Sequence, residues 1–452
     1  MRRVGNIYGM ICDRENVARA LSRAAAGVRK TPAILDRLDN FMDTVDAVRD
    51  LLVRKAYAPG PYREMVVTEP KRRVIHVLPF FPDRIVQHAV VDVVGPLVWE
   101  PRFIADSYAC RAGKGTHRGI ARAAGFVRRN AWDMRYDIRD FYHSIDHAVL
   151  RRLLARSLKD PDALDILYRI IGSFGWRDGR GCPIGNLTSQ WFGNVYLNAL
   201  DHFVKERLRV ACYVRYCDDF HLFAGTKAEL KACDAAIGPF VEDTLRMAFS
   251  KRNLQRTADG CDFLGARIFP RKILLRRSTA RRIRRRMEGI RRVLDRGGLT
   301  GRRVQSMLGC VSSAMGSISH MQTRNFSRSI GLEGLRHDVR RAHQAFFGNG
   351  HTRHHGGPEN PNRRDAQQGD RADAHGMEVV QTHQGGGREP RALRDGAVLL
   401  RGRSRQGDPR GVHRLAHDHG PALGQAHGVP VRGEGEGCGK LLLPDLREVC
   451  DE

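Results

Sequence analysis

Residues 213–223, YVRYCDDFHLF, place two adjacent acids between two short runs of alternating apolar side chains. In an extended chain Tyr213 and Arg215 face one way while Val214 and Tyr216 face the other, so the Cys-Asp-Asp step predicts the tight turn of a β-hairpin. Two carboxylates at such a tip repel each other, and hard oxygen ligands of this kind suit Mg²⁺ or Mn²⁺. A solvated Asp-Asp turn is the simpler alternative, because Asp is a common turn residue.

The whole chain of 452 residues is strongly basic and long enough for more than one domain. Lys and Arg number 77 against 50 acids, and the formal charge of +27 predicts a polyanionic partner such as nucleic acid. The longest apolar stretch, residues 85–99, is interrupted by polar side chains, which argues against a membrane-spanning helix. The N-terminus lacks the apolar stretch of a secretory signal, and the cysteines form no CxxC pair. We therefore expect a cytoplasmic protein with reduced thiols and no membrane partner.

A third acid, Asp137, stands among β-forming side chains in the stretch WDMRYDIRDFYHSIDH. An acid in a strand is poorly solvated and needs a partner, and a strand laid beside the hairpin would bring Asp137 to Asp218 and Asp219. Three carboxylates around two Mg²⁺ ions roughly 4 Å apart form the site that activates a 3′-hydroxyl and stabilises a leaving pyrophosphate. Asp140 and Asp146 are rivals for this role, although Asp146 precedes a helix and is more simply explained as its N-cap.

The segments before this strand have helical and then β character. Apolar residues spaced by three and four predict helices across residues 1–60. β-forming runs around a Pro-Lys-Arg-Arg step then predict a hairpin that presents Lys71, Arg72 and Arg73 on its loop, before a helix that begins near Asp83. The loop is either a solvated basic turn or a cationic binding site.

Basic side chains and glycines are interleaved in the stretch at residues 103–129, and a helix is predicted to follow them. The glycines let the backbone approach a phosphate, and Arg111, Lys114 and Arg118 would follow a nucleic-acid strand. Because the spacing differs from that of a P-loop, the stretch predicts a phosphate-tracking surface.

A Gly-Pro loop opens residues 179–208 and continues into a helix rich in amides and hydroxyls. Gln190 and Asn194 share one face of this helix by the three-and-four rule. Uncharged polar side chains that follow a flexible loop suit contact with a base pair and a template backbone. The alternative is a core helix capped by Thr188 or Ser189.

After the hairpin the sequence predicts a helix over residues 227–247 and then short strands, with a turn at Phe263-Leu264-Gly265. A strongly cationic helix follows, capped by Ser278 or Thr279, and helices extend to about residue 345. The exposed face of the cationic helix predicts contact with nucleic acid through Arg281, Arg284 and Arg285.

In this order the segments resemble the reverse transcriptase family over roughly residues 15–340. The matching palm motifs are strand-borne Asp137, the Gly-Pro loop and helix at 181–197, the Tyr216-Cys217-Asp218-Asp219 tip, a Lys251-bearing segment and the FLG turn at 263–265. Within the family, the bacterial reverse transcriptases of diversity-generating retroelements are the most similar. The stretches that carry this likeness are EPKRRVI (69–75), DRIVQHA (83–89), DSYACRAGKGTHR (106–118) and PIGNLTSQ (183–190).

The resemblance implies an α+β right-hand polymerase with fingers, a palm built on an antiparallel sheet, and a helical thumb. The expected divisions are a helical lead-in at 1–60, fingers at 61–130, a palm at 131–272 with an insertion near 150–180, and a thumb at 273–347. Residues 348–452 contain no Phe, Trp, Tyr or Ile, so a disordered tail or a frameshifted reading is expected there.

The resemblance also implies roles for single residues. Asp137, Asp218 and Asp219 correspond to the catalytic carboxylates that bind two Mg²⁺ or Mn²⁺ ions, and Tyr142 to the bulky residue that excludes a ribose 2′-hydroxyl. The remaining nucleotide-binding residues are Lys71, Arg73, Ile184, Gly185 and Gln190, with the choice among Lys71, Arg72 and Arg73 left open. The implied nucleic-acid contacts are Arg111, Lys114, Arg118, Asn194, Lys251, Arg281, Arg284 and Arg285.

Two substitutions distinguish this chain from the usual family pattern. Ile184 stands where many reverse transcriptases have Gln, and in diversity-generating enzymes this loop is associated with misincorporation opposite template adenines. Cys217 stands at the second position of the YxDD tip, where Met, Val or Ala is more frequent, so the size and polarity beneath the primer end differ.

The function implied is an RNA-directed DNA polymerase that copies a template-repeat RNA into adenine-mutagenised cDNA from deoxynucleoside triphosphates. Template RNA, the cDNA primer and a small basic helical accessory protein are the expected partners. A defence-type or retron-like bacterial reverse transcriptase and a maturase-like RNA-binding protein are the alternatives. A basic scaffold with purely structural acids is a third, and it would leave three embedded acids without counter-ions.

Overall fold

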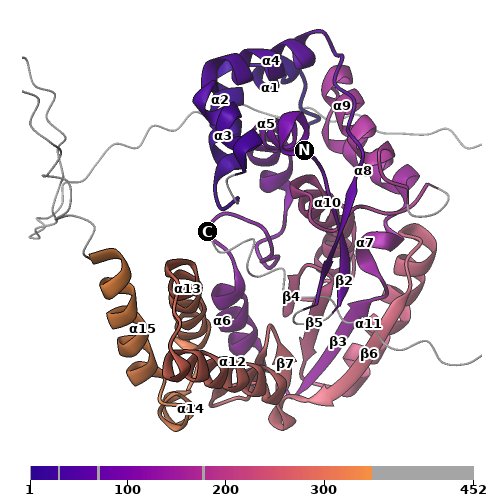
Figure 1. Ribbon diagram of the computed structural model, residues 1–452. Coiled ribbons are helices and arrows are strands. Elements are labelled where there is room, and N and C mark those ends of the chain that lie inside the picture. Colours follow the sequence, from indigo (N-terminus) through magenta and orange to yellow (C-terminus); the bar gives the residue numbers. More distant parts are fainter. Residues whose placement is uncertain (1, 29–30, 69–71, 176–178, 349–452) are drawn as a thin grey trace, which may run out of the picture. The chain divides into compact units, whose positions relative to one another are not determined.

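The computed structural model describes residues 2–28, 31–68, 72–175 and 179–348 (Figure 1). Lys71 and the predictions for the chain after residue 348 lie outside these ranges. The helices are α1 (Tyr8–Ile11), α2 (Arg14–Ala25), α3 (Pro32–Asp39), α4 (Phe41–Val53), α5 (Ile85–Val94), α6 (Thr116–Val127), α7 (Phe141–Ser144), α8 (His147–Ser157), α9 (Pro161–Gly172), α10 (Leu187–His202), α11 (Lys227–Pro239), α12 (Arg277–Arg296), α13 (Gly301–Ile318), α14 (Arg324–Ser329) and α15 (Leu332–Phe347). The strands are β1 (Arg63–Val67), β2 (Arg73–Val77), β3 (Trp132–Ile138), β4 (Tyr213–Tyr216), β5 (Asp219–Ala224), β6 (Phe249–Arg256), β7 (Cys261–Phe263), β8 (Ala266–Ile268) and β9 (Ile273–Leu275).

The central sheet has the strand order β4–β5–β3–β6, and every neighbouring pair is antiparallel (Figure 1). Strands β1 and β2 form a separate antiparallel hairpin, and β7, β8 and β9 form a third antiparallel sheet. Strand β3 therefore lies between the β4–β5 hairpin and the later strand β6. Helices and antiparallel sheets occur together, which confirms the α+β class expected from the sequence.

Alternation along β3 gives this strand one apolar face and one charged face. Met134, Tyr136 and Ile138 are buried in a hydrophobic core to which β5, α8, α10 and α11 also contribute. Arg135 and Asp137 alternate with these residues and therefore lie on the opposite face. The apolar side chains of β3 hold this strand against the helices, and its charged side chains lie on the opposite face.

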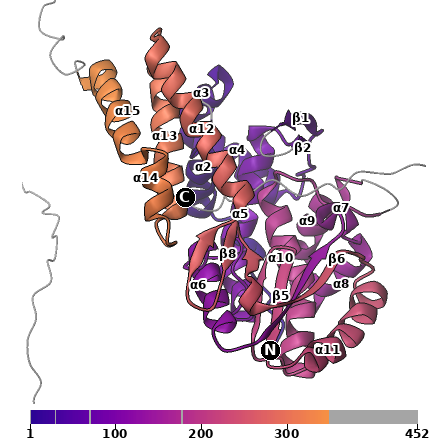
Figure 2. The same ribbon diagram turned by 90° about the horizontal axis from the view of Figure 1, so that it is seen from below.

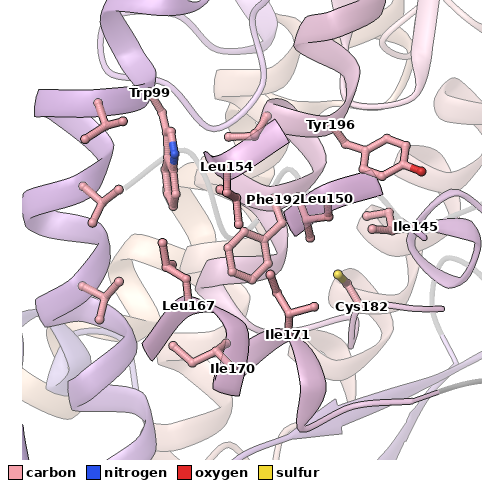
Figure 3. Packing of buried hydrophobic residues seen from close by; sticks show 14 of the residues in the cluster. Trp99, Ile145, Leu150, Leu154, Leu167, Ile170, Ile171, Cys182, Phe192 and Tyr196 are labelled. Atoms are coloured by element: carbon pink, nitrogen blue, oxygen red, sulfur yellow. The ribbon is translucent and has the colours of Figure 1, made fainter. Parts of the chain in front are cut away.

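The largest core joins α5, α8, α9 and α10 (Figure 3). Phe192 of α10 lies among Leu154 of α8, Leu167 and Ile171 of α9, and Trp99. Full burial of a side chain of this size contributes ~1.5–3 kcal/mol of hydrophobic stabilisation. Helix α10 is thereby held rigidly, together with the polar residues at its N-terminal end.

A second hydrophobic cluster packs α6 and the β7–β8 hairpin against the β4–β5 hairpin, with Phe126, Val214, Phe223 and Phe263 among its buried residues. The β7–β8 turn contains Leu264 and Gly265, both with positive φ, 49° and 75°. The turn that the sequence predicted at residues 263–265 is therefore present.

Helices α12, α13 and α15 pack around a cluster of their own (Figure 2). Ile283, Met287 and Ile290 of α12 are spaced by three and four and are buried in it. The predicted cap of α12 is wrong, because the helix begins at Arg277 with Arg276 at the N-cap and no side-chain capping bond. The N–H of Arg276 bonds to the Gly265 carbonyl at 2.9 Å, which starts the helix before Ser278.

Other local predictions have mixed outcomes. The Asp146 side chain accepts a hydrogen bond from the N–H of Val149, so Asp146 is the N-cap of α8 as expected. Helix α10 begins at Leu187, after Asn186, and no side chain caps it, so neither Thr188 nor Ser189 is its cap. The predicted helical lead-in is present as α1 to α4. Nowhere in the described ranges does a helix have the length and apolarity to cross a membrane.

Candidate active site

The sheet register brings the acids of β3 and of the β4–β5 hairpin together. Asp137 is directly opposite Asp219, and Tyr216 pairs with Asp219 from the other side. Asp218 lies in the turn between the two strands, and Cys217 before it has a left-handed backbone with φ 52°. The convergence of the three acids, which the sequence could only predict, is therefore a property of the fold.

Burial and like charge shift two of these carboxyl groups in the same direction. Burial and repulsion from Asp137 and Asp219 raise the pKa of Asp218 to about 8. Burial and the charge of Asp219 also raise the pKa of Asp137, although the Ser250 hydroxyl donates a hydrogen bond to its Oδ2. A raised pKa means that the carboxylate form is disfavoured at these two positions, and a bound cation would stabilise that form.

Asp219 differs from the other two acids because cations contact it. Nε of Arg135 donates to Oδ1 and Nη2 donates to Oδ2, each over 3.0 Å, and His221 Nε2 lies 3.6 Å from Oδ1. Burial alone would raise the pKa of Asp219, but these cations hold it below its ordinary value. Asp219 therefore has a counter-ion within the protein, because Arg135 lies on the neighbouring strand.

The chemistry of the acids suits a hard divalent cation. Asp137 and Asp218 offer carboxylate oxygens, the ligands that Mg²⁺ and Mn²⁺ prefer. Within the described ranges no group of three His, Cys, Asp or Glu side chains is arranged as a metal site. The raised pKa values nevertheless show that ionising both carboxyls is unfavourable, which a bound cation would reverse. Asp137 and Asp218 are thus the residues that would hold such an ion, with Asp219 beside them.

The Gly-Pro loop forms backbone hydrogen bonds both to α7 and to the β1–β2 hairpin. The N–H of Cys182 donates to the Tyr142 carbonyl over 2.8 Å, and the N–H of His76 donates to the Ile184 carbonyl over 3.2 Å. Tyr142, Ile184 and Arg73 are buried, and the positive charge of Arg73 opposes the rise in the pKa of the nearby turn acid. Three predicted nucleotide-binding residues are therefore connected by one loop and one strand, and Arg73 lies near the carboxylates.

Gly185 lets this loop approach β2 closely. Its φ is 113°, and a Cβ at this position would lie 2.6 Å from Cγ2 of Ile75. A side chain would be strained both by the backbone conformation and by this contact, so glycine is required here. Gln190 lies in the first turn of α10 and is partly exposed.

Two residues predicted to contact nucleic acid lie in the interior. The Arg111 side chain is 5% exposed, pairs with Glu100 and donates to backbone carbonyls. Asn194 is 3% exposed, donates to the Ala109 carbonyl and accepts from Arg215. Both predictions are wrong, because residue type and helical spacing do not reveal that α10 packs against the loop that precedes α6.

The other predicted nucleic-acid contacts are at the surface or close to it. Lys251 is exposed on β6, directly opposite Asp137 in the sheet register. Lys114, in the loop before α6, and Arg118, in the first turn of α6, both donate to backbone carbonyls of that loop. The exposed arginines of α12 include Arg281, Arg284 and Arg285.

Several residues that the sequence did not single out complete the site. Arg215 is fully buried, pairs with Asp201 of α10 at 2.5 Å and donates to the Cys217 carbonyl at 3.0 Å. Gly193 of α10 makes room for Phe141, since a Cβ there would lie 2.9 Å from that ring. No sequence signal marks these contacts, because they join segments that are distant along the chain.

Arg135 and His221 were also missed, although a signal for them exists. Arg135 stands two residues before Asp137, and His221 stands two residues after Asp219. The period of two along a strand puts each on the same face as its neighbouring acid. Extending the strand alternation outward from the acids would have found both.

Carboxylates at a β-hairpin turn, opposite an acid on the adjacent antiparallel strand, are the arrangement expected from the resemblance to a polymerase palm. Residues 67–268 match the family model described as reverse transcriptase (RNA-dependent DNA polymerase). This range extends from the β1–β2 hairpin to β8 and includes all three acids. The match covers a little under half of the chain, and it supports RNA-directed DNA polymerase activity for this segment.

Curated proteins with related sequences support this family. The chain is 24% identical over 272 residues to Protein YkfC of Escherichia coli (strain K12), which covers 50% of this chain and 71% of YkfC. It is 28% identical over 193 residues to Group II intron-encoded protein LtrA of Lactococcus lactis subsp. cremoris, which covers 38% of this chain and 31% of LtrA. The chain thus spans about a third of LtrA.

Solved structures of telomerase show only a distant likeness. Apo telomerase from Candida tropicalis aligns with a TM-score of 0.38 and 10% identity, covering 64% of this chain and 59% of that chain.

Proposed function

We propose that this reverse transcriptase serves a diversity-generating retroelement and copies a template-repeat RNA into cDNA mutated opposite adenines. The observation that most supports this proposal is the stretch PIGNLTSQ at 183–190, in which Ile184 stands where many reverse transcriptases have glutamine. The Ile184 side chain is buried, and the loop backbone bonds to β2. An aliphatic group thus replaces an amide next to the strand of Arg73, and the loss of polar contacts near the nascent pair would relax base selection.

The residues of the site have distinct expected tasks in nucleotidyl transfer. Asp137 and Asp218 would hold the divalent ions, which when bound lower the barrier for attack of the primer hydroxyl and loss of pyrophosphate. The Arg73 cation would bind the triphosphate of the incoming deoxynucleotide. Tyr142, packed beside Gly193, would exclude a ribose 2′-hydroxyl. Exposed cations such as Lys251 would contact the template and primer backbones.

Primer extension on an adenine-containing RNA, followed by product sequencing, tests this proposal. We expect deoxynucleotide incorporation that depends on Mg²⁺ or Mn²⁺, with errors concentrated opposite adenines. Asp218→Asn should abolish incorporation, and Ile184→Gln should lower the error frequency at adenines by about tenfold while incorporation continues. Accurate copying at adenines by the wild-type chain would refute the mutagenic role and leave the polymerase activity intact.

A second candidate is a role in intron or retron-like RNA metabolism, which the similarity to an intron-encoded protein favours. Such an enzyme would copy one structured RNA faithfully, or would bind it as a maturase does. RNA recovered with the protein from cells distinguishes the two, because intron RNA would support this candidate. A template repeat next to the gene, a variable repeat that differs at adenines, and a gene for a small basic helical partner would support the first proposal. Both proposals place synthesis in the cytoplasm.

A further inference from the structure

Four ionisable side chains of alternating charge, Asp133, His221, Asp219 and Arg135, form a continuous series of contacts next to the turn that carries Asp218. His221 Nδ1 is 2.8 Å from Asp133 Oδ1, and His221 Nε2 is 3.6 Å from Asp219 Oδ1. Arg135 completes the series through its two 3.0 Å bonds to Asp219. All of these side chains share the charged face of the central sheet, since they alternate along β3 and β5.

The inner end of this series is sealed from solvent. The side chains of Asp133 and His221 are 0% exposed, while those of Arg135 and Asp219 are 13% and 19% exposed. The ring of Phe263 covers His221 at a centroid distance of 5.0 Å. Buried charges persist only when they are paired. The paired side chains therefore hold Asp219, the most exposed of the four, in a fixed position.

The turn that carries Asp218 is held at both ends by arginines. Arg215 Nη1 donates to the Cys217 carbonyl at the start of the turn. Arg135 bonds to both oxygens of Asp219 at its end. Because Arg135 belongs to β3, the strand of Asp137, one side chain connects the strand of one catalytic acid with the turn of another.

We propose that Arg135 is a positioning residue of the polymerase site, which fixes Asp219 and so orients the turn that presents Asp218 towards Asp137. This inference rests on the polymerase function and adds a residue outside the carboxylate set. A planar guanidinium can bond both carboxylate oxygens, whereas a lysine supplies charge without the second bond. A displacement of ~1 Å in a catalytic group can cost on the order of 10²-fold in rate. A small rotation of the turn is therefore sufficient to lower the rate of nucleotide incorporation.

Arg135→Gln and Arg135→Lys in the full-length chain test the proposal, with Arg128→Gln, at an exposed arginine, as the control. For Arg135→Gln we expect kcat in primer extension to fall about 30–100-fold, and KM for the deoxynucleotide to change by less than about threefold. Arg135→Lys should be intermediate and the control unchanged. The Mn²⁺ concentration that half-maximally raises the melting temperature without RNA should increase several-fold for Arg135→Gln.

Comparison with Asp219→Asn shows whether Arg135 acts through that carboxylate. If it does, the double variant Arg135→Gln, Asp219→Asn has a kcat within about twofold of Asp219→Asn alone. Multiplied losses in the double variant would overturn the proposal, and so would an Arg135→Gln enzyme with unchanged kcat and Mn²⁺ midpoint. The double variant removes both charges together, so it remains informative if Arg135→Gln alone does not fold. Absence of primer extension by the wild type would refute the polymerase function, and the Mn²⁺ midpoints would still test the positioning role.

Discussion

Asp137, Asp218 and Asp219 share one functional group and differ only in their surroundings. Arg135 and His221 hold the pKa of Asp219 below its ordinary value, whereas burial and like charge raise the pKa values of Asp137 and Asp218. The protein thereby keeps one acid ionised and fixed, and leaves two acids that gain most from a cation. At the scale of the residue, the acids differ in their contacts: Asp219 is paired with Arg135, whereas the surroundings of Asp137 and Asp218 raise the pKa values of those two acids.

Asp218→Asn is expected to stabilise the protein increasingly as pH rises in the presence of EDTA. Burial raises the pKa of Asp218 from 3.8 to about 8 in the native state, so between these values the native state binds more protons than the unfolded state. Stability therefore falls as pH rises through this window. From pH 5.5 to pH 8 the difference in unfolding free energy between variant and wild type should grow by about 1–3 kcal/mol in favour of the variant, as measured with urea.

Asp46→Asn is the matched control, because the fold shifts the pKa of Asp46 in the opposite direction to that of Asp218. The hydrogen bond from Arg14 lowers the pKa of Asp46, so its stabilising contribution is present at neutral pH and is lost as pH falls through the lowered value. The Asp46→Asn difference should therefore not grow from pH 5.5 to pH 8. A difference for Asp218→Asn that stays constant over the same range would contradict the assigned burial of Asp218.

Arg215→Met is expected to destabilise the chain strongly. Arg215 and Asp201 are both 0% exposed, their contact is 2.5 Å, and the Tyr213 hydroxyl also donates to Asp201. Removing the arginine leaves a buried anion without its cation, which costs about 3–5 kcal/mol. Urea unfolding should show this loss in the single variant and recovery of most of it in Arg215→Met, Asp201→Leu. Equal losses in both variants would show that packing and not charge dominates.

At the scale of the element, alternation along β3 directs its apolar side chains into the core and its charged side chains to the opposite face. Its apolar residues enter the core shared with α8, α10 and α11, and its charged residues lie on the opposite face, where Asp137 is opposite the end of the β4–β5 turn. The Gly-Pro loop has a comparable dual role, because its backbone bonds to both the Tyr142 carbonyl and His76 of β2. Close approach of this loop to β2 depends on Gly185.

Gly185→Ala is expected to strain the loop and weaken deoxynucleotide binding. The backbone φ of 113° disfavours any Cβ, and a Cβ would lie 2.6 Å from Ile75 Cγ2. We expect a loss of about 1–2 kcal/mol in unfolding free energy and a several-fold rise in KM for deoxynucleotides. Adding Ile75→Ala should relieve the contact but not the backbone strain. Gly225→Ala is the control, because no atom lies within 4 Å of its Cβ position, and an equal effect there would exclude this explanation.

At the scale of the whole molecule, the charge of +27 is far from neutral and predicts salt-sensitive binding to nucleic acid. Buried arginines such as Arg111 and Arg215 contribute to the formal charge, but their guanidinium groups are paired inside the fold. The exposed arginines of α12 remain, opposite the face that packs against α13 and α15. They form one surface on which the charge can act, in addition to exposed cations such as Lys251.

Replacing Arg281, Arg284 and Arg285 together by Gln should reduce the salt dependence of RNA binding. Each phosphate contact that is lost lowers the slope of log Kobs against log salt by about 0.7–0.9, so the triple variant should lose about 2–3 units of slope. Filter binding between low and moderate salt measures this slope. Replacing Arg14, Arg19 and Arg23 of α2 by Gln removes the same charge elsewhere. Equal changes in the two variants would mean that binding follows net charge and not the α12 surface.

The sequence alone determined the features that depend on local chemistry. Alternation predicted β3 and the β4–β5 hairpin, the FLG step predicted the β7–β8 turn, and Asp146 was identified as a helix cap. The order of these motifs was sufficient to indicate a reverse transcriptase. Each of these features depends on neighbours within a few residues, where periodicity and turn preference are decisive.

The tertiary structure alone decided which charged groups are partners. Arg135 and Asp219 are 84 residues apart in the sequence and bond to each other across two strands. The interior positions of Arg111 and Asn194 arise in the same way, from contacts between distant segments. A charge in the folded chain is stabilised by whatever lies within a few ångströms, and chain order does not specify that neighbour. The sequence therefore determined the identity of the acids, and the fold determined their states of ionisation.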